Sequence, residues 1–282
     1  MNIVLFISKD LAGCLAFNEL YPRIGTHIRA VFYSTGVGNK DRKVPALQLL
    51  EYYEAVHPFE VVFPQLDTGS FITIEDITSR TGIPCSAAPE MDESFAQHLR
   101  ALKADLFLSV RFGKLFKGSF LSIAPMGILN LHSAILPAYR GILGTLHSLL
   151  DGRNQIGCTL HYVPDEGIDN GAILGIATLP VHPDRSLFWH VWNLYPGGVQ
   201  LIDKVVQQLA QGITPPAAIQ DAGQSRYFSL PSTHHFELLK AKGVEIITQR
   251  DYTDYFSTSV GTHTSHIVTA ALAKIDPKYA LS

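Results

Sequence analysis

Three polar residues near the middle of the chain could together transfer an acyl group to an amine. Asn130 and His132 stand two residues apart at the end of an apolar run, residues 127–131. That run predicts a strand, in which side chains two residues apart point to the same face. The Asn130 amide could stabilise the oxyanion that forms when an amine attacks a carbonyl, an effect typically worth ~10²–10³ in rate. His132 could take the proton of the amine, directly or through water, while Asp169 could orient the imidazole, favour its charged form or hold that water.

Each of these residues also has a structural explanation that involves no chemistry. Asn130 could cap a turn, His132 could be a core residue with satisfied hydrogen bonds, and Asp169-Asn170-Gly171 is typical of a tight turn. The order of the surrounding motifs favours the catalytic interpretation. It runs Gly127-Ile-Leu-Asn-Leu-His132, Leu136-Pro137, Tyr139-Arg140-Gly141, Gly157-Cys-Thr-Leu-His161 and Asp169-Asn170-Gly171.

This order resembles that of the formyltetrahydrofolate-dependent formyltransferases, a family that includes the glycinamide ribonucleotide, methionyl-tRNA and nucleotide-sugar N-formyltransferases. The resemblance extends over about residues 1–200 in layout and is most specific over residues 126–174. It implies a Rossmann-like formyltransferase domain with 10-formyltetrahydrofolate as the formyl donor. It also implies that Asn130, His132 and Asp169 are the catalytic residues.

The chain departs from the family pattern at two positions. Ala134 stands where the family has a serine, so a hydroxyl that helps to shape the loop is missing. The run from His161 to Asp169 is one residue longer than usual, with Pro164 inserted, so the pterin loop is expected to differ in shape. Neither change removes a member of the catalytic trio, and an active enzyme is expected.

The resemblance further implies which segments bind the folate. The backbone of residues 111–116 is expected to line the folate pocket, and the loop of residues 163–169 is expected to close over the pterin. The residues concerned are Arg111, Phe112, Gly113, Lys114, Leu115, Phe116, Val163, Asp165, Glu166, Gly167 and Ile168.

Two other segments are expected to contact the acceptor. Ser8, Lys9 and Asp10 form the first predicted strand-to-helix turn, which lacks the G-x-G-x-x-G pattern of dinucleotide-binding proteins. Tyr139 and Arg140 lie on the loop after His132, where Arg140 could bind an anionic group of the acceptor or could only hold the loop. A second turn, residues 34–42, is polar and rich in glycine. It could hold an acceptor phosphate or be an ordinary surface loop.

Apolar strand patterns alternate with helical patterns and predict an α/β fold with a doubly wound, mostly parallel sheet. Ligands of such sheets bind outside the carboxyl ends of the strands, and Arg111, Asn130 and His132 all fall at such ends. The predicted strands are residues 2–7, 28–33, 61–63, 106–110, 127–131, 158–162 and 172–178. The predicted helices are residues 11–20, 44–56, 73–81, 94–102, 144–150 and 186–211.

The last part of the chain predicts a small extension. We expect a catalytic domain over residues 1–200 and an α+β extension over residues 201–282, with helices at 233–242 and 267–275 and a strand at 244–248. Residues 200–282 contain seven Lys or Arg and seven Asp or Glu. A tail that binds transfer RNA should be basic, and a minimal glycinamide ribonucleotide enzyme would lack the tail, so a nucleotide-linked amino sugar is the expected acceptor. Arg226 and Tyr227 could contact its phosphate or base, or could pack the tail onto the main domain.

Composition excludes several other classes of protein. The formal net charge of −3 gives no basic surface for nucleic acid. The three cysteines are odd in number and widely spaced, as in reduced cytosolic proteins. No signal peptide or membrane-spanning stretch is visible, so we expect a cytoplasmic protein with no membrane partner. The paired histidines at 234–235 and 263–266 lack a third ligand at useful spacing, so no metal is expected. Trp189 and Trp192 are expected to be core residues or contacts of a homodimer.

The sequence therefore predicts a folate-dependent N-formyltransferase that acts on a primary amine of a small, nucleotide-linked amino sugar. Alternatives within enzymes are formylation of another small amine (an amino acid, a siderophore precursor or a ribonucleotide) and hydrolysis of 10-formyltetrahydrofolate. The folate hydrolases of this family carry an additional N-terminal module, whereas this chain starts directly at its first predicted strand. A folate-binding protein without turnover is the alternative from outside enzymes.

Overall fold

A seven-stranded sheet forms the centre of the protein. The computed structural model describes residues 1–36 and 43–281. The strand order is β3-β2-β1-β4-β5-β7-β8; β1 to β5 run parallel, and β7 and β8 pair antiparallel with their neighbours. The strands are β1 (Ile3–Ser8), β2 (Ile28–Ser34), β3 (Cys85–Ala87), β4 (Leu106–Val110), β5 (Ile128–His132), β7 (Gln155–Tyr162) and β8 (Ile173–Pro180). The predicted α/β class with a mostly parallel sheet is confirmed.

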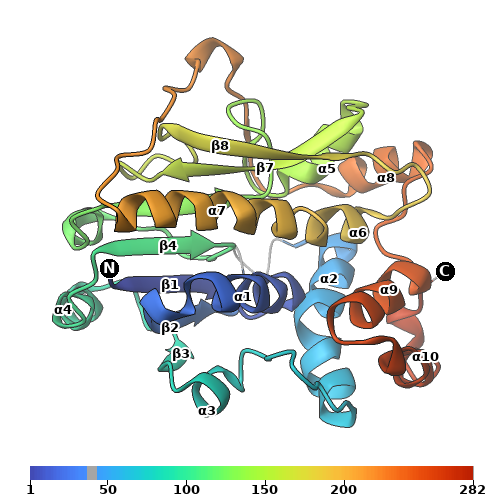
Figure 1. Ribbon diagram of the computed structural model, residues 1–282. Coiled ribbons are helices and arrows are strands. Elements are labelled where there is room, and N and C mark those ends of the chain that lie inside the picture. Colours follow the sequence, from blue (N-terminus) through green and yellow to red (C-terminus); the bar gives the residue numbers. More distant parts are fainter. Residues whose placement is uncertain (37–42, 282) are drawn as a thin grey trace.

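The central strands β1 and β4 are apolar except for Ser8 and Ser109, because helices cover both faces of the sheet. Every residue of these two strands is buried. Alternate residues face opposite layers: Leu5 packs with α1 (Leu11–Ile24) and α7 (Tyr195–Ala210), whereas Phe6 packs with α4 (Glu93–Ala101). Figure 1 shows α1 and α7 together in front of the sheet. The carboxyl ends of β1, β4 and β5 remain open, and ligands bind there in sheets of this kind.

The chain after β2 is helical over a longer stretch than the sequence predicts. α2 (Pro45–Glu51) continues into the π-helical segments η3 (Tyr52–Val56) and η4 (Pro58–Val62) and then into η5 (Phe63–Gln65). The predicted strand at residues 61–63 is therefore wrong. Its β-branched and aromatic residues suit a strand locally, but Val62 and Phe63 are buried on one side of a helical turn that packs against α10 (Ser265–Leu272). Tertiary packing overrides the local preference here.

Two predicted helices differ in extent from those observed. The first, predicted at residues 73–81, begins only at α3 (Ile77–Thr81). The second, predicted as one helix over residues 186–211, is divided into α6 (Leu187–Trp192) and α7. Pro196 occupies the first turn of α7, where its missing N–H leaves no hydrogen bond unmade.

The last part of the chain is mainly helical. α8 (Thr233–Ala241) and α10 lie close to their predicted positions, but α9 (Gln249–Ser259) was not predicted. The predicted strand at residues 244–248 is wrong. The carbonyls of Glu245 and Ile246 instead accept hydrogen bonds from the N–H groups of Leu187 and Phe188. These N–H groups begin α6 and have no partner inside that helix. The predicted domain boundary after residue 200 falls within α7, and the division into two domains stays a prediction.

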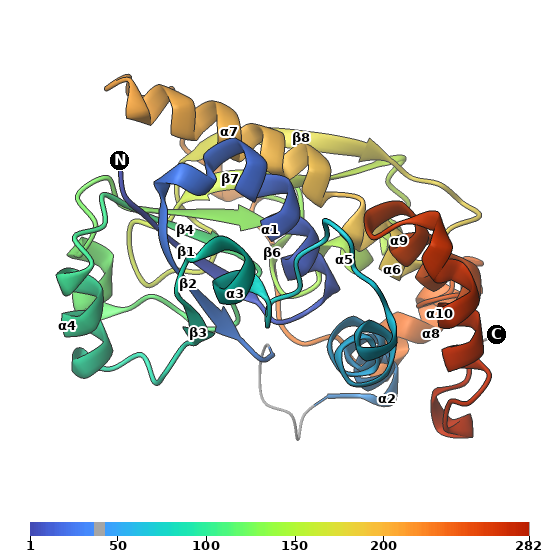
Figure 2. The same ribbon diagram turned by 60° about the horizontal axis from the view of Figure 1, so that its bottom comes forward.

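The last part of the chain also forms a separate, two-stranded sheet with the loop that follows β5. β9 (Tyr227–Phe228) pairs in parallel with β6 (Arg140–Gly141), just before α5 (Gly144–Leu150). Figure 2 shows α9 and α10 lying beside the helical segment that starts with α2. None of the helices in the described part of the chain combines the length and the apolarity needed to cross a bilayer.

Candidate active site

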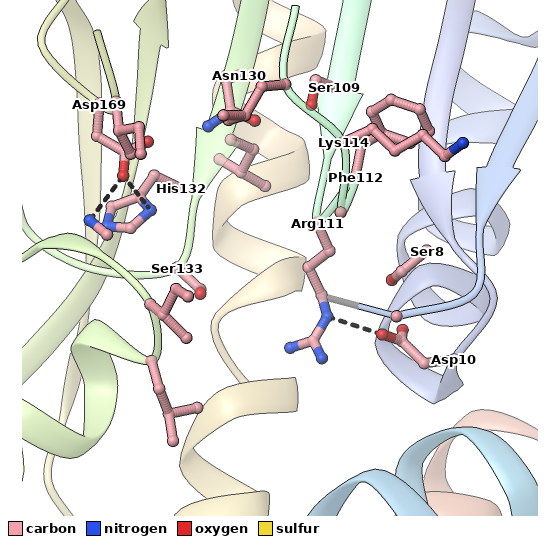
Figure 3. A pocket seen from close by; sticks show the side chains of 18 of the residues that line it. Ser8, Asp10, Ser109, Arg111, Phe112, Lys114, Asn130, His132, Ser133 and Asp169 are labelled. Carbon is pink, nitrogen blue, oxygen red and sulfur yellow. Dashed lines mark hydrogen bonds and ion pairs between the residues drawn. The ribbon is translucent and has the colours of Figure 1, made fainter. Parts of the chain in front are cut away.

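A cavity of about 470 Å³ lies at the carboxyl ends of β1, β4 and β5. Asn130, His132 and Asp169 line it, and so do all of the residues predicted to bind the folate and the turn at Ser8, Lys9 and Asp10. Figure 3 shows Asn130, His132 and Asp169 on one side of this space and Arg111 and Asp10 on the other. Tyr139 and Arg140 do not line the cavity, although both were predicted to contact the acceptor.

The position of His132 between two oxygen atoms determines which of its nitrogens can accept a proton. Nε2 lies 2.7 Å from the carbonyl oxygen of Tyr139, so in the neutral ring this nitrogen carries the proton and donates it. Nδ1 then holds the lone pair, 3.5 Å from Oδ2 of Asp169. A proton that arrives at Nδ1 would face the Asp169 carboxylate.

A second histidine, His161 on β7, lies on the other side of Asp169. Its Nδ1 donates to the carbonyl oxygen of Tyr162 at 2.7 Å, so Nε2 of the neutral ring is an acceptor. Nε2 accepts from Nδ2 of Asn130 at 3.2 Å and lies 3.4 Å from Oδ1 of Asp169. His161 therefore holds one N–H of the Asn130 amide, and within residues 1–36 and 43–281 the second N–H has no acceptor.

Asp169 is held by the backbone as well as by the histidines. It adopts a left-handed conformation with φ of 52°, a position that a non-glycine residue occupies only when its surroundings require it. Its Oδ2 accepts a hydrogen bond from the backbone N–H of Gly141 at 2.8 Å. Burial alone would raise the pKa of Asp169, but the two histidines and this N–H hold that pKa well below its usual range. Asp169 is therefore a carboxylate across the physiological pH range.

The loop after β5 supports the site from behind. The hydroxyl of Tyr139 donates a hydrogen bond to Asp151 at 2.8 Å, and the backbone carbonyl of Tyr139 accepts one from Nε2 of His132. Arg140 donates through Nε to the carbonyl of Ile168 at 2.8 Å and through Nη1 to Ser225 at 3.0 Å. These contacts connect the loop after His132 to the loop of Asp169. An acceptor-binding role of Tyr139 and Arg140 stays a prediction.

The replacement of a serine by Ala134 occurs where the packing is very close. Ala134 is buried, and a Cβ added at Gly144 would lie 2.4 Å from the Ala134 Cβ. The carbonyl oxygen of Ala134 accepts from the hydroxyl of Thr159, which in turn accepts from the N–H of Leu136. The loop thus obtains its hydrogen bonds from Thr159.

Opposite Asn130, His132 and Asp169 lies a cluster of largely buried charges, formed by Asp10, Glu54 and Arg111. Nε of Arg111 donates to Oδ2 of Asp10 at 3.0 Å, and Nη2 donates to Oε2 of Glu54 at 2.8 Å. Burial opposes the charge of Arg111, but the two carboxylates raise its pKa well above the usual value. Burial raises the pKa of Glu54 to about 7 against the opposing effect of Arg111, with Asp10 adding to the rise. Arg111 itself has a positive φ of 57°.

The predicted folate-binding segments form one wall of the cavity. Oε1 of Glu166 accepts from the N–H of Gly118 at 3.1 Å, which ties the loop of residues 163–169 to the segment that follows residue 116. Phe112 and Phe116 pack against Phe6 with ring centroids 5.1 and 5.0 Å apart. The Arg111 side chain points toward Asp10 (Figure 3), so contact of this residue with a folate would be through its backbone. Binding by these residues stays a prediction.

The returning β9 completes the rim of the cavity. Tyr227, which is about half exposed, and Leu230 line it. Gly141 permits the pairing, because it has φ of 93° and a Cβ there would lie 2.1 Å from the carbonyl oxygen of Phe228. Arg226 pairs with Asp151 and lies over the rings of Tyr139 and Phe228. These contacts pack the tail onto the catalytic loop, which is one of the two roles predicted for Arg226. The predicted phosphate turn at residues 34–42 lies largely outside the described residues.

His161 and Glu54 line the cavity but were not predicted as site residues. His161 belongs to a motif that the sequence shows, and its approach to Asp169 follows from the antiparallel pairing of Asn130 with His161 between β5 and β7. Glu54 lies in a predicted helix with no motif around it. Its contact with Arg111 joins residues 57 positions apart, and no local pattern could have revealed it.

Comparison with known proteins agrees with this geometry. The family model for "Formyl transferase" matches residues 38–188, which is more than half of the chain. The chain belongs to the formyl transferase family. A methionyl-tRNA formyltransferase from a Synechococcus strain is 29% identical over 222 residues, covering 75% of this chain and 66% of that protein. One from Chlamydia caviae is 35% identical over 121 residues, covering 43% of this chain and 37% of that protein. This chain thus spans less than two thirds of the length of these relatives.

Solved structures show the same fold at low identity. The N-formyltransferase from Helicobacter canadensis, in complex with folinic acid and dTDP-3-aminofucose, has a TM-score of 0.55 and is 17% identical, covering 81% of this chain and 71% of that chain. Glycinamide ribonucleotide transformylase 1 from Symbiobacterium toebii has a TM-score of 0.55 and is 20% identical, covering 78% of this chain and 94% of that chain.

Proposed function

We propose that this protein transfers a formyl group from 10-formyltetrahydrofolate to a primary amine of a small, nucleotide-linked amino sugar. The observation that carries the proposal is the convergence of Asn130, His132 and Asp169 at one side of a cavity in a formyl transferase family member. An amide donor, a base and a carboxylate are the groups that amide formation from a formyl carbonyl requires.

His132 is the proposed base, and Nδ1 is the atom that receives the proton. An attacking amine must give up a proton for the amide to form, and Nδ1 is the nitrogen that the Tyr139 carbonyl leaves without one. Asp169 would accept a hydrogen bond from the protonated Nδ1 after a small closure of the 3.5 Å separation. With an amine bound nearby, a water between Nδ1 and the amine could serve the same transfer.

Asn130 is the proposed donor to the carbonyl oxygen. His161 holds one of its N–H groups, which fixes the plane of the amide and directs the second N–H without further reorganisation. Prepositioned donors of this kind stabilise the negative charge that develops on the oxygen. His161 is therefore proposed as a positioning residue for both Asn130 and Asp169.

The wall formed by residues 111–116 and 163–169 suits a folate. It combines backbone segments with the flat or branched apolar side chains of Phe112, Phe116, Val163 and Ile168, and an aromatic bicycle requires such surfaces. When bound there, 10-formyltetrahydrofolate would supply the formyl group; its bond from the formyl carbon to N10 would break, and N10 would leave as tetrahydrofolate with the proton that the amine gives up. Two structural neighbours were solved with folinic acid or 5-N-formyl-THF, which supports the choice of donor.

The amino-sugar acceptor is supported by the balance of charge in the tail and by the structural neighbours. Residues 200–282 have equal numbers of acidic and basic side chains, which does not favour a polyanionic transfer RNA. Sugar N-formyltransferases are among the proteins with this fold. The curated relatives favour a second candidate, formylation of methionyl-tRNA.

Turnover measured against a panel of acceptors tests the proposal. Conversion of 10-formyltetrahydrofolate would be followed by absorbance with dTDP- and UDP-amino sugars, glycinamide ribonucleotide, methionyl-tRNA and no amine. Turnover that depends on an amino sugar and is lost in His132→Ala is the expected result. Formylation of methionyl-tRNA alone would support the second candidate. Equal turnover without amine would identify a hydrolase, and folinic acid binding without any turnover would contradict an enzymatic role.

A further inference from the structure

The cluster of Asp10, Glu54 and Arg111 has no part in the formyl transfer described above, yet it lines the same cavity. The three residues come from the β1–α1 turn, the π-helical segment η3 and the end of β4. Their side chains are 9%, 12% and 18% exposed. In Figure 3 the guanidinium of Arg111 points into the space between Ser133, next to His132, and Asp10. A molecule whose amine reaches His132 would therefore extend toward this cluster.

The cluster presents donors and an acceptor to the cavity side by side. A guanidinium has five N–H groups. Nε donates to Asp10, one N–H of Nη2 donates to Glu54, and Nη1 lies 3.5 Å from the hydroxyl of Tyr195. The remaining N–H groups of Nη1 and Nη2 have no acceptor among the described residues. Oε1 of Glu54 likewise receives no hydrogen bond from the described residues. A hydroxyl group, which both donates and accepts, complements this arrangement.

The charges around the cluster do not favour a phosphate at this position. Among the described residues that line the cavity, Lys9 pairs with Glu75 at 2.6 Å, Lys43 with Glu51 at 2.7 Å and Lys114 with Glu90 at 3.7 Å. Arg111 pairs with two carboxylates. A phosphate bound to Arg111 would lie against Asp10 and Glu54, and like charges brought together in a buried site oppose binding. An uncharged hydroxyl brings no such repulsion.

The cluster is also held in place before any ligand binds. Arg111 is kept in a left-handed conformation, which is unfavourable for a side chain of this size. Glu54 lies on a π-helical turn, a form that is often found at functional sites. The neighbouring Tyr53 donates to the carbonyl oxygen of Tyr279 at 2.6 Å, and His57 contacts the hydroxyl of Tyr252 at 2.7 Å. The last part of the chain thus supports the turn that carries Glu54.

We propose that Asp10, Glu54 and Arg111 form a hydroxyl-binding clamp for the acceptor, so that a hydroxylated ring and not a phosphate lies between His132 and Arg111. Arg111 donates to the acceptor hydroxyls, Glu54 accepts from them, and Asp10 positions Arg111. This inference rests on the proposed function and specifies which part of the acceptor enters the site. A nucleotide attached to such a ring would lie outside the clamp.

Binding of simple ring amines tests the clamp without requiring turnover. Affinities of glucosamine, mannosamine, 3-amino-3-deoxyglucose and dTDP-3-aminofucose would be measured by calorimetry with folinic acid present. Cyclohexylamine is the matched ring without hydroxyls, and dTDP and inorganic phosphate are the anionic probes. We expect at least one of the hydroxylated amines that carry no nucleotide to bind tenfold or more tightly than cyclohexylamine.

Variants then separate the clamp from the rest of the cavity. Glu54→Met is expected to weaken that amine about tenfold and to leave cyclohexylamine and folinic acid within twofold. Glu54→Gln, which keeps the volume and one acceptor oxygen, should have a smaller effect and serves as the test if Glu54→Met does not fold. Glu51→Gln is the control variant. Glu51 lines the same cavity and pairs with Lys43, so this variant also removes an acid paired with a cation, but it should preserve the preference for hydroxylated amines.

Three results would overturn the clamp. The first is that cyclohexylamine and every hydroxylated amine bind equally well. The second is that both Glu54 variants bind hydroxylated amines as tightly as wild type. The third is that phosphate or dTDP binds and that Arg111→Met abolishes this binding. Failure of the proposed function is distinguishable from these outcomes. Formylation of cyclohexylamine as efficient as that of the hydroxylated amines would preserve formyl transfer while removing the clamp. Hydroxyl-dependent binding without any turnover would preserve the clamp and remove the enzyme.

Discussion

Two polar clusters face each other across one cavity, and they are constructed differently. The catalytic cluster of Asn130, His132, His161 and Asp169 is built on neighbouring strands and one loop, and backbone groups fix the orientation of its rings and carboxylate. The clamp of Asp10, Glu54 and Arg111 contains side-chain ion pairs that join residues 101 and 57 positions apart. In the proposed mechanism the first cluster controls where a proton goes, whereas the proposed clamp controls which molecule is held.

The clearest way to break this distinction is to remove the proposed catalytic groups. His132→Ala is expected to lower kcat by ~10²–10⁴ and Asn130→Ala by ~10²–10³, because a general base and an oxyanion donor act mainly in the transition state. The affinity for folinic acid should change less than threefold in both variants, as measured by calorimetry. Near-normal kcat in both variants would remove the assignment of this cluster to catalysis.

The second prediction uses the opposite pH dependence of the two acids. Glu54 has a raised pKa of about 7, so its contribution to stability is fully present below its unfolded pKa near 4.5 and is lost as the pH rises through 7. Asp169 has a depressed pKa, so its contribution is present above pH 4 and is lost only on strong acidification. Asp10, Glu51 and Arg111 face Glu54 or act on its titration, and they remain in place in Glu54→Gln.

The stability of wild type relative to Glu54→Gln should therefore fall by about 3 kcal/mol between pH 4.5 and pH 8, which is the shift in pKa expressed as free energy. Urea unfolding at these two pH values measures the difference. Parallel pH profiles for wild type and variant would mean that Glu54 is ionised in the same way in both the folded and unfolded states.

The two clusters also differ in how far the sequence reveals them. Asn130 and His132 could be selected as site candidates because a predicted strand places them on one face and a short motif contains each of them, and both line the cavity. The buried runs at β1 and β4 likewise predicted the central parallel strands, since residues covered on both faces are continuously apolar. In both cases the information lies within a few consecutive residues.

The features that the sequence did not predict depend instead on segments far apart in the chain. Residues 61–63 were predicted as a strand but form helical turns that pack against α10, about 200 residues later in the chain. Residues 244–248 were also predicted as a strand but cap the start of α6. Glu54 meets Arg111 only because the whole sheet brings β4 beside the π-helical segment. These features depend on contacts between distant segments, and no local pattern encodes them.

The third prediction concerns His161, which connects the two halves of the catalytic cluster. His161→Gln removes the ring that holds Asn130 and faces Asp169, and a positioning residue of this kind is expected to cost about tenfold in kcat. KM for the acceptor should change less than threefold, because the clamp is untouched. His161→Leu, which has no polar atom to hold Asn130, should lose more activity than His161→Gln if positioning is its role. A loss confined to KM would instead place His161 in acceptor binding.

The smallest expected effect comes from the contact that joins the tail to the catalytic loop. Arg226 is 46% exposed at its side chain, so its pairing with Asp151 and its position over two aromatic rings should contribute about 1 kcal/mol to stability. Arg226→Met keeps the apolar stem and removes the charge. A urea unfolding curve should show a loss of this size that shrinks in high salt, with kcat within threefold of wild type. A loss of catalysis much larger than the loss of stability would show that β9 positions the His132 loop directly, and the division of the cavity into a catalytic cluster and a clamp would then have to include the tail.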